Sequence, residues 1–326
     1  MPTARAPRSV GHRLRRGMVV ALVLIAAWVG AIALAGYLGW SQVNRVDALP
    51  HTGDRPVAGS GSNYVLVGSD SRAGLSKAER KKLATGNPPG KRTDSIMLVH
   101  LGSGEPTLIS IPRDSYVPIR GQGSNKINAS YALGGPPLLI DTVEQVSGLR
   151  VDGFIEIGFG GFASVVDSLD GVNMCLKRPM NDRLAGINLR AGCQTLDGPN
   201  ALGYVRARYS DPLGDIGRIQ RQRQFLGALL GKAASPGNVL LPWRLHGIST
   251  AGAQALTVDN DASALEVAKV MLAIRDIGRG NGTSTSVPVS NPNLQTPVGS
   301  AVKWDSPKAR ALFSDLKADR SLSVKP

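Results

Sequence analysis

One segment of the chain, RARYSDPLGDIGRIQRQRQF (206–225), concentrates positive charge. It holds only two acids, Asp211 and Asp215, against five arginines. Guanidinium groups this close repel one another unless an anion lies among them, and each binds phosphate oxygens in pairs. The segment therefore predicts an anion site built from arginine side chains. These are Arg206, Arg208, Arg218, Arg221 and Arg223.

A helix that begins near Asp215 would organise these side chains. Arg218 and Gln222 are four residues apart, so they would share one face of it. Arg223 falls on another face, where we expect it to face solvent. The tight turn before the helix would fold the two preceding arginines back toward Arg218. The alternative is a solvated basic helix face that binds nothing.

Three further stretches, GSDSR, RTDSIMLV and SIPRDSYV, place charged residues at the ends of apolar runs. Each alone is compatible with a structural salt bridge. Together with the arginine segment they match the needs of phosphoryl transfer, in which arginines bind phosphates, carboxylates hold Mg²⁺ and one carboxylate accepts a proton. Mg²⁺ needs only one or two protein carboxylates when phosphates supply other ligands. The charged residues are Asp70, Arg72, Arg92, Asp94, Arg113 and Asp114.

The elements that must position these residues form a mixture of strands and helices without repeats. Strands are predicted at 64–67, 95–101, 107–112, 151–158, 172–176 and 286–290, the second and third as a hairpin. Helices are predicted at 136–150, 159–172, 198–208, 216–234, 261–277 and 306–319, with Asp261 and Ser306 as N-caps of the last two. Residues 74–91 read as a surface excursion. The pattern predicts one mixed α/β domain with a central mixed β-sheet flanked by helices.

The N-terminal region predicts a membrane anchor. Residues 17–40 contain no charge, and they are long enough to cross a hydrocarbon core of about 30 Å. Five arginines and no acid precede them, which favours a cytoplasmic N-terminus. A cleaved signal peptide is the alternative, although the run exceeds a usual signal core. The expected organisation is a cytoplasmic basic tail 1–16, a transmembrane helix 17–40, a linker 41–62 and an extracellular domain 63–320.

Charge and cysteine content fit an exported protein. The net charge is +14, and subtracting the five N-terminal arginines leaves +9 for the exported part. Export excludes chromosomal nucleic acid as a partner and leaves anionic lipid or acidic polymer. Cys175 and Cys193 form an even pair, which predicts a disulfide outside the cell, with two buried thiols as the alternative. No Walker loop, histidine pair or G-x-S-x-G motif offers another chemistry.

These motifs, in this order behind one apolar segment, resemble the LytR–CpsA–Psr family of cell-wall ligases. The match covers about residues 63–235 and includes KINASYALGG and DGFIEIGFGGFASVVDSLDGV. The resemblance implies transfer of a glycopolymer from a polyprenyl-pyrophosphate carrier to the muramic acid 6-hydroxyl of peptidoglycan, outside the cytoplasmic membrane. The alternatives are a polyprenyl-pyrophosphate hydrolase and a non-catalytic, membrane-anchored binder or regulator of anionic wall polymer. Richness in Ala, Gly and Arg favours an actinobacterial source, so arabinogalactan is one candidate polymer beside teichoic-acid-like and capsular polymers.

The resemblance also implies roles for single residues. Asp70 and Asp94 match the acids associated with Mg²⁺, or with Mn²⁺ in its place, and Asp215 would orient arginines or interact with the metal. Asp94 is also the preferred base, and Arg92, Arg113 and Arg218 complete the catalytic set. The pyrophosphate is expected to contact Arg72, Arg92, Arg113, Lys126, Arg206, Arg208, Arg218 and Gln222. An apolar pocket for the lipid tail would draw on Phe154, Ile157, Phe159, Phe162, Val165, Val166 and Leu169.

Overall fold

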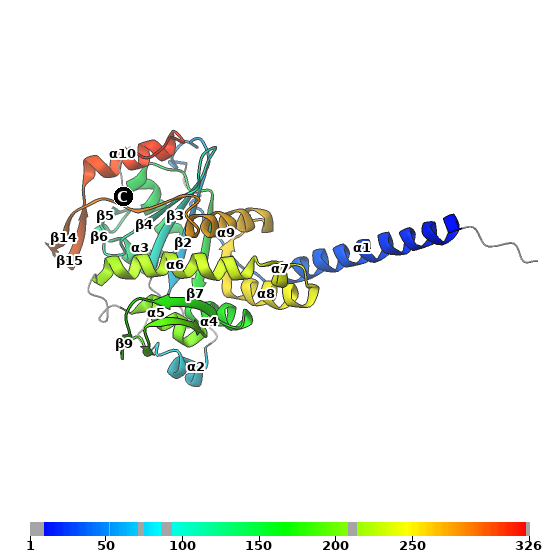
Figure 1. The fold of residues 1–326 in the computed structure, drawn as a ribbon. Coiled ribbons are helices and arrows are strands. Elements are labelled where there is room, and N and C mark those ends of the chain that lie inside the picture. The colour runs from blue at the N-terminus through cyan, green and yellow to red at the C-terminus, as the bar shows by residue number, and fades with distance from the viewer. Residues whose placement is uncertain (1–9, 52, 71–74, 86–92, 208–213, 324–326) are drawn as a thin grey trace, which may run out of the picture.

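The computed structural model describes residues 10–51, 53–70, 75–85, 93–207 and 214–323. Within these, a seven-stranded mixed sheet forms the centre of the domain (Figure 1). In spatial order the strands are β1 (Asn44–Val46), β12 (Leu256–Asp259), β7 (Gly153–Gly158), β2 (Ser62–Ser69), β3 (Thr93–Leu101), β4 (Thr107–Ile111) and β13 (Thr283–Ser286). Parallel and antiparallel pairs both occur, which confirms the predicted mixed sheet.

The strand register brings the charged strand ends to one edge. β2 and β4 both run antiparallel to β3, so their C-terminal ends meet its N-terminal end. β7 is parallel to β2 and ends at the same edge. Asp70, Asp94 and Arg113, from three separate motifs, therefore emerge close together. The predicted hairpin of β3 and β4 is confirmed.

Helices cover both faces of the sheet. On one face, α3 (Ile127–Ser147) and α10 (Ser306–Lys317) pack against the sheet through buried side chains such as Leu139 and Phe313. On the other face, α9 (Ala264–Gly278) packs through Val270 and Ile274, beside α6 (Gly214–Ala233). β7 is buried on both faces over Gly153–Glu156, because helices lie on both sides of it.

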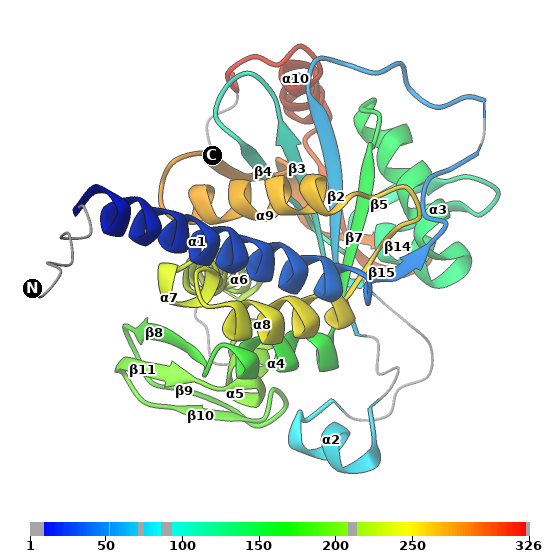
Figure 2. The same cartoon turned by 90° about the vertical axis from the view of Figure 1, so that its right-hand side faces the viewer.

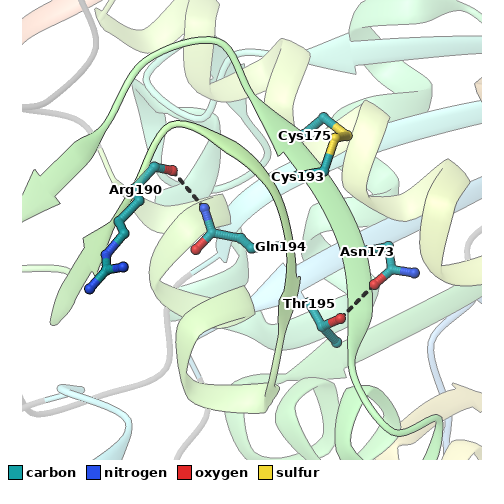
Figure 3. The surroundings of a disulfide bond; sticks show 6 residues. All are labelled: Asn173, Cys175, Arg190, Cys193, Gln194 and Thr195. Atoms are coloured by element: carbon teal, nitrogen blue, oxygen red, sulfur yellow. Dashed lines mark hydrogen bonds between the residues drawn. A yellow bond between two sulfur atoms is a disulfide. The ribbon is translucent and has the colours of Figure 1, made fainter.

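A second, smaller core lies beneath α6. It joins α4 (Phe159–Ser168) and α5 (Gly198–Arg206) to two short hairpins. These hairpins are β8 (Val172–Leu176) with β11 (Gly192–Leu196) and β9 (Met180–Asp182) with β10 (Ile187–Leu189). Cys175 and Cys193 are directly opposite in the first hairpin and form the predicted disulfide (Figure 3).

Several details differ from the sequence predictions. The N-cap of α9 is Ser263, not Asp261, because Ser263 and Glu266 form a reciprocal capping box. Asp305, not Ser306, caps α10. The strand predicted at 286–290 spans the end of β13 and the start of β14 (Val289–Thr296). Some elements were not predicted: α7 (Pro236–Val239), α8 (Pro242–Ala255), β5 (Tyr116–Ile119), β6 (Gly123–Lys126) and β15 (Gly299–Trp304). The described part of the 74–91 excursion contains one short helix, α2 (Lys77–Lys82).

Helix α1 (Val10–Trp40) projects from the domain, and its C-terminal part lies beside α8 (Figures 1 and 2). Its stretch Leu14–Trp40 is long and apolar enough to cross a membrane, and most of its side chains are exposed. One such helix fits a single-pass membrane anchor. Part of the predicted linker belongs to the folded unit, because β1 adds the edge strand beside β12.

Candidate active site

A polar cavity of about 200 Å³ opens at the edge where the charged strand ends meet. Elements far apart in the sequence supply its walls: β3, the end of β4, the β9–β10 hairpin, the end of α5 and the first half of α6. Three guanidinium groups face two carboxylates, so the lining carries a net positive charge. The lining residues are Asp94, Arg113, Asp182, Leu184, Ala185, Arg206, Arg218 and Gln222.

Asp94 and Arg113 form an ion pair in this cavity. Arg113 Nη1 donates a hydrogen bond to Asp94 Oδ1 across 2.5 Å. On its other side, Arg113 Nε lies 3.5 Å from Asp114 Oδ2, and Lys126 Nζ lies 3.6 Å from Asp114 Oδ1. Lys126, predicted to contact the anion directly, is not among the described residues that line the cavity, and its ammonium group faces Asp114. Both groups of the Asp94–Arg113 pair are partly exposed, so an incoming anion can contact Arg113.

Arg206 ends α5 and spans the boundary between polar and apolar surroundings. Its guanidinium stacks over the Phe159 ring, 4.6 Å from the ring centroid, a favourable cation–π geometry. Its Nη1 also donates to the carbonyls of Leu83 and Ala84, at 3.2 and 3.4 Å. These contacts hold the side chain at the cavity wall.

The predicted helix face is confirmed in α6. Arg218 is buried and lines the cavity together with Gln222 one turn later. Gln222 accepts a hydrogen bond from the Ser95 hydroxyl at 3.0 Å and donates to the Val205 carbonyl at 3.1 Å. These two contacts fix its amide between β3 and α5.

Arg221, also in α6, has a structural role. It is buried and donates to the carbonyls of Tyr204 at 2.9 Å and Ala207 at 2.7 Å. It thereby ties α6 to the end of α5, where Arg206 lies.

The prediction that Arg223 faces solvent is wrong. Its guanidinium lies over the sheet and donates to the hydroxyls of Ser110 and Ser286 and to the carbonyl of Thr285. Burial lowers the pKa of Arg223 to about 10, which still leaves it charged at neutral pH. The helix lies across the sheet, so a residue off the cavity face meets β4 and β13 instead of water.

A buried polar cluster lies at the ends of β2 and β7. The Tyr131 hydroxyl donates to Glu156 Oε2 at 2.7 Å, and both residues are buried, as is Asp70. Burial raises the pKa of Tyr131, and the negative charges of Glu156 and Asp70 add to this. Tyr131 therefore stays protonated and acts as a hydrogen-bond donor.

An apolar cavity of about 300 Å³ continues from the polar one. The two share Asp94, Arg206 and Gln222 in their walls. Beyond these, the apolar cavity runs between the sheet and helices α4, α6 and α8. Of the candidates for a lipid pocket, Ile157, Phe159, Phe162 and Val165 line it. Phe154, Val166 and Leu169 do not, because they are fully buried in the two cores.

Some predicted site residues cannot be placed. Arg72, Arg92 and Arg208 lie outside the described residues, and so does the side chain of Asp215. Conversely, no motif in the sequence indicates that the β9–β10 hairpin forms a wall of the cavity. Asp182 accepts hydrogen bonds from the backbone N–H groups of Leu184 and Ala185, at 3.1 and 3.0 Å, and shapes that turn. The stretch that holds it carries no motif tied to phosphate chemistry.

The carboxylates at this site fit a divalent cation only if a bound phosphate-containing ligand supplies further oxygen atoms. Among the residues that the structure describes, no three His, Cys, Asp or Glu side chains come together as a metal site. Asp70 and Asp94, at the adjoining ends of β2 and β3, offer two carboxylates. Two suffice for Mg²⁺ when phosphate oxygens and water supply the other ligands.

A family model described as the LytR_cpsA_psr family matches residues 44–316, which include the sheet and both cavities. The chain belongs to the LytR–CpsA–Psr family. The probable cell wall biosynthesis protein LcpB of Corynebacterium glutamicum is 46% identical over 279 residues, which are 85% of this chain and 66% of that protein. The polyisoprenyl-teichoic acid–peptidoglycan teichoic acid transferase TagU of Bacillus licheniformis is 37% identical over 179 residues, 54% of each chain. The chain thus spans about two thirds or less of the length of these two relatives.

Solved structures of family members share the fold. The LytR-Csp2A-Psr enzyme from Actinomyces oris aligns with a TM-score of 0.63 at 22% identity, over 84% of this chain and 96% of that one. The structure described as TagT bound to LI-WTA aligns with a TM-score of 0.60 at 24% identity, over 85% and 99%. The resemblance to the LytR–CpsA–Psr family inferred from the motifs is therefore confirmed.

Proposed function

We propose that this protein transfers a glycopolymer from a polyprenyl-pyrophosphate carrier to peptidoglycan. The observation that carries the proposal is the junction of the two cavities at Asp94, Arg206 and Gln222. A positively charged cavity that continues into a larger apolar one fits an amphiphile with an anionic head and a long apolar tail. The names of the relatives LcpB and TagU, which concern cell-wall assembly, agree with this ligand class.

In this proposal the guanidiniums of Arg113, Arg206 and Arg218 hold the pyrophosphate. The acceptor hydroxyl, the muramic acid 6-hydroxyl, attacks the phosphorus that bears the glycan. The bond from this phosphorus to the bridging oxygen breaks, polyprenyl phosphate leaves, and a base accepts the hydroxyl proton. Asp94 is the preferred base because it lies in both cavity walls, beside Arg113.

The charges around the pyrophosphate explain why this site would accelerate the reaction. Negative charge grows on the leaving phosphate, and preorganised guanidiniums stabilise it without reorganisation. Mg²⁺, or Mn²⁺ in its place, held by Asp70 and Asp94 together with the donor's phosphates, would supply further positive charge there. The described arginines would also supply positive charge at the leaving phosphate. Each is held in place by its position after β4, at the end of α5 or in α6.

The location follows from α1. We propose that α1 anchors the protein with the N-terminus in the cytoplasm, which places both cavities on the outer side, where peptidoglycan is assembled. The polymer itself stays a prediction, with arabinogalactan as one candidate beside teichoic-acid-like and capsular polymers. Reporter fusions after residue 50 should be active only outside the cytoplasm, and activity inside would contradict this orientation.

The test uses full-length protein in detergent with a labelled polyprenyl-pyrophosphate glycan donor, with and without a peptidoglycan acceptor. Label should become attached to the acceptor through a phosphodiester, and Asp94→Asn should slow this transfer by roughly 10²–10³-fold. Equal release of polyprenyl phosphate with and without acceptor would favour a hydrolase instead. Donor binding without turnover under any divalent cation would favour a non-catalytic binder.

A further inference from the structure

The corner between α7 and α8 carries two large apolar side chains that the domain does not cover. Leu240 is 47% exposed and Trp243 is 69% exposed. A single exposed apolar residue is ordinary on a soluble surface. This pair is different because Trp243 lies on α8, the helix that contacts the predicted membrane anchor, and Leu240 lies just before that helix.

Specific contacts fix α8 along the C-terminal part of α1, and the two helices run in the same direction. Gln254 Nε2 donates to Gln42 Oε1 at 2.6 Å, and Ser249 Oγ donates to the Ala35 carbonyl at 3.1 Å. Gly39 allows the close approach, since a Cβ at that position would overlap the Ser249 side chain. The position of α8 relative to the membrane is therefore set by α1.

These contacts place the α7–α8 corner beside the apolar part of α1. From Gln254 to Ser249, α8 moves along α1 from Gln42 back to Ala35. Trp243 lies six residues further, about 9 Å at a rise of about 1.5 Å per residue. The corner reaches further along α1 than the rest of the domain does (Figure 1). It is thus level with the outer part of the apolar stretch Leu14–Trp40.

We propose that the α7–α8 corner inserts Leu240 and Trp243 into the bilayer leaflet on the domain's side of the membrane. Tryptophan is favoured at membrane interfaces, and apolar side chains of interfacial helices bury themselves at the boundary of headgroups and acyl chains. Arg244, which follows Trp243 and pairs with Asp170 at 2.9 Å, keeps its charge at the level of the headgroups. This second attachment needs α1 as a span but is independent of the catalytic activity.

The insertion has a consequence for the apolar cavity. Ile248 and Gly252 of α8 line that cavity, while Ser249 of the same helix contacts α1. One helix would therefore separate the cavity from the bilayer and hold it at a fixed orientation to the surface. A single span alone would leave the domain free to tilt.

The test reconstitutes the full chain into phosphatidylcholine nanodiscs, with Trp28 and Trp40 of α1 both changed to Phe. Fluorescence of Trp243 is obtained by difference from the same variant carrying Trp243→Phe. Lipids brominated near the headgroup should quench most of this emission. Aqueous iodide should quench it several-fold less than it quenches free tryptophan. Val298→Trp, in the β14–β15 turn at the opposite end of the domain, is the control in the variant that lacks Trp243.

The control tryptophan should show the reverse pattern, with strong iodide quenching and none by brominated lipid. Trp243 behaving like the control would overturn the proposal. Protection of Trp243 from iodide without quenching by brominated lipid would indicate a second copy of the chain on this surface, and would overturn it as well.

Discussion

Arg113 donates a hydrogen bond of 2.5 Å to Asp94 across the polar cavity, joining the ends of β4 and β3. The bond sets where the Asp94 carboxylate points, while Asp114 lies on the Nε side of the same guanidinium. The two residues belong to separate motifs, RTDSIMLV and SIPRDSYV, and neither motif alone indicates that they meet. Strand register, with β3 antiparallel to β4, brings them together.

Asp94→Asn and Arg113→Lys should each slow glycan transfer by roughly 10²–10³-fold, by analogy with removal of one preorganised electrostatic group. Lysine cannot replace the bidentate guanidinium. Because the two residues contact each other, the double variant should lose less than the product of the two losses. Steady-state transfer rates measure this. Asp114→Asn, one step further from the cavity, is the matched control and should lose much less; full activity of Asp94→Asn would remove Asp94 from the mechanism.

Arg223→Ala should lower stability, since it removes the donor for the Ser110 and Ser286 hydroxyls over the sheet. Loss of such partly buried hydrogen bonds costs about 1–3 kcal/mol. Urea unfolding of the full chain in detergent measures it. Gln224→Ala, at the next and exposed position of α6, should change the free energy of unfolding by less than about 0.5 kcal/mol. Equal stability of the two variants would mean that Arg223 makes no such contacts.

The contrast between Arg218 and Arg223 shows how far the sequence reaches. Helical spacing correctly puts Arg218 and Gln222 on one face, because that periodicity is local. It does not indicate what covers the other faces, which depends on how α6 crosses the sheet. The same limit applies to Asp182 and to the apolar cavity, whose walls come from segments distant in the chain. Strands β2, β3, β4, β7 and β8, most helices and the disulfide were predictable because apolar runs, caps and cysteine count are local signals.

Tyr131→Phe should destabilise the domain near neutral pH by about 1–3 kcal/mol, because it leaves the buried Glu156 carboxylate without that donor. The difference should shrink above about pH 10. There the unfolded tyrosine ionises, at its usual pKa of about 10. The folded one, whose pKa is raised by burial, keeps its proton. By linkage, the stability that the Tyr131 hydroxyl contributes to the wild-type protein is therefore lost as pH rises. Urea unfolding at pH 7, 9 and 10.5 tests the trend, and a difference that grows with pH would contradict it.

Removing the Cys175–Cys193 disulfide by a double Ser substitution should cost about 3 kcal/mol, as expected for a loop of this length. Thr195→Ala is the control, because Thr195 bonds Asn173 at 2.6 Å in the same hairpin (Figure 3). That exposed bond should contribute no more than about 0.5–1.5 kcal/mol. Non-reduced peptide mapping should recover the two cysteines in one linked peptide, and two alkylatable thiols would contradict the bond.

Two glycines of α8 separate the role of the apolar cavity from that of the polar one. Gly252 lines the apolar cavity, Gly247 is exposed, and a Cβ at either position would meet no atom within 4 Å. Leucine at each site gains the same helix propensity, about 1 kcal/mol over glycine. Only Gly252→Leu places its side chain where we propose the polyprenyl tail lies.

Gly252→Leu should therefore raise the KM for a full-length polyprenyl donor and leave the KM for a short-chain donor with the same pyrophosphate and glycan nearly unchanged. Burial of one methylene group is worth about 0.8 kcal/mol. A leucine side chain that displaces several methylene groups of the tail should therefore weaken binding by at least tenfold. Gly247→Leu should match wild type with both donors. Initial rates over a range of donor concentrations decide it. If Gly252→Leu weakens both donors equally, the tail does not occupy this cavity and the leucine acts by distorting the site.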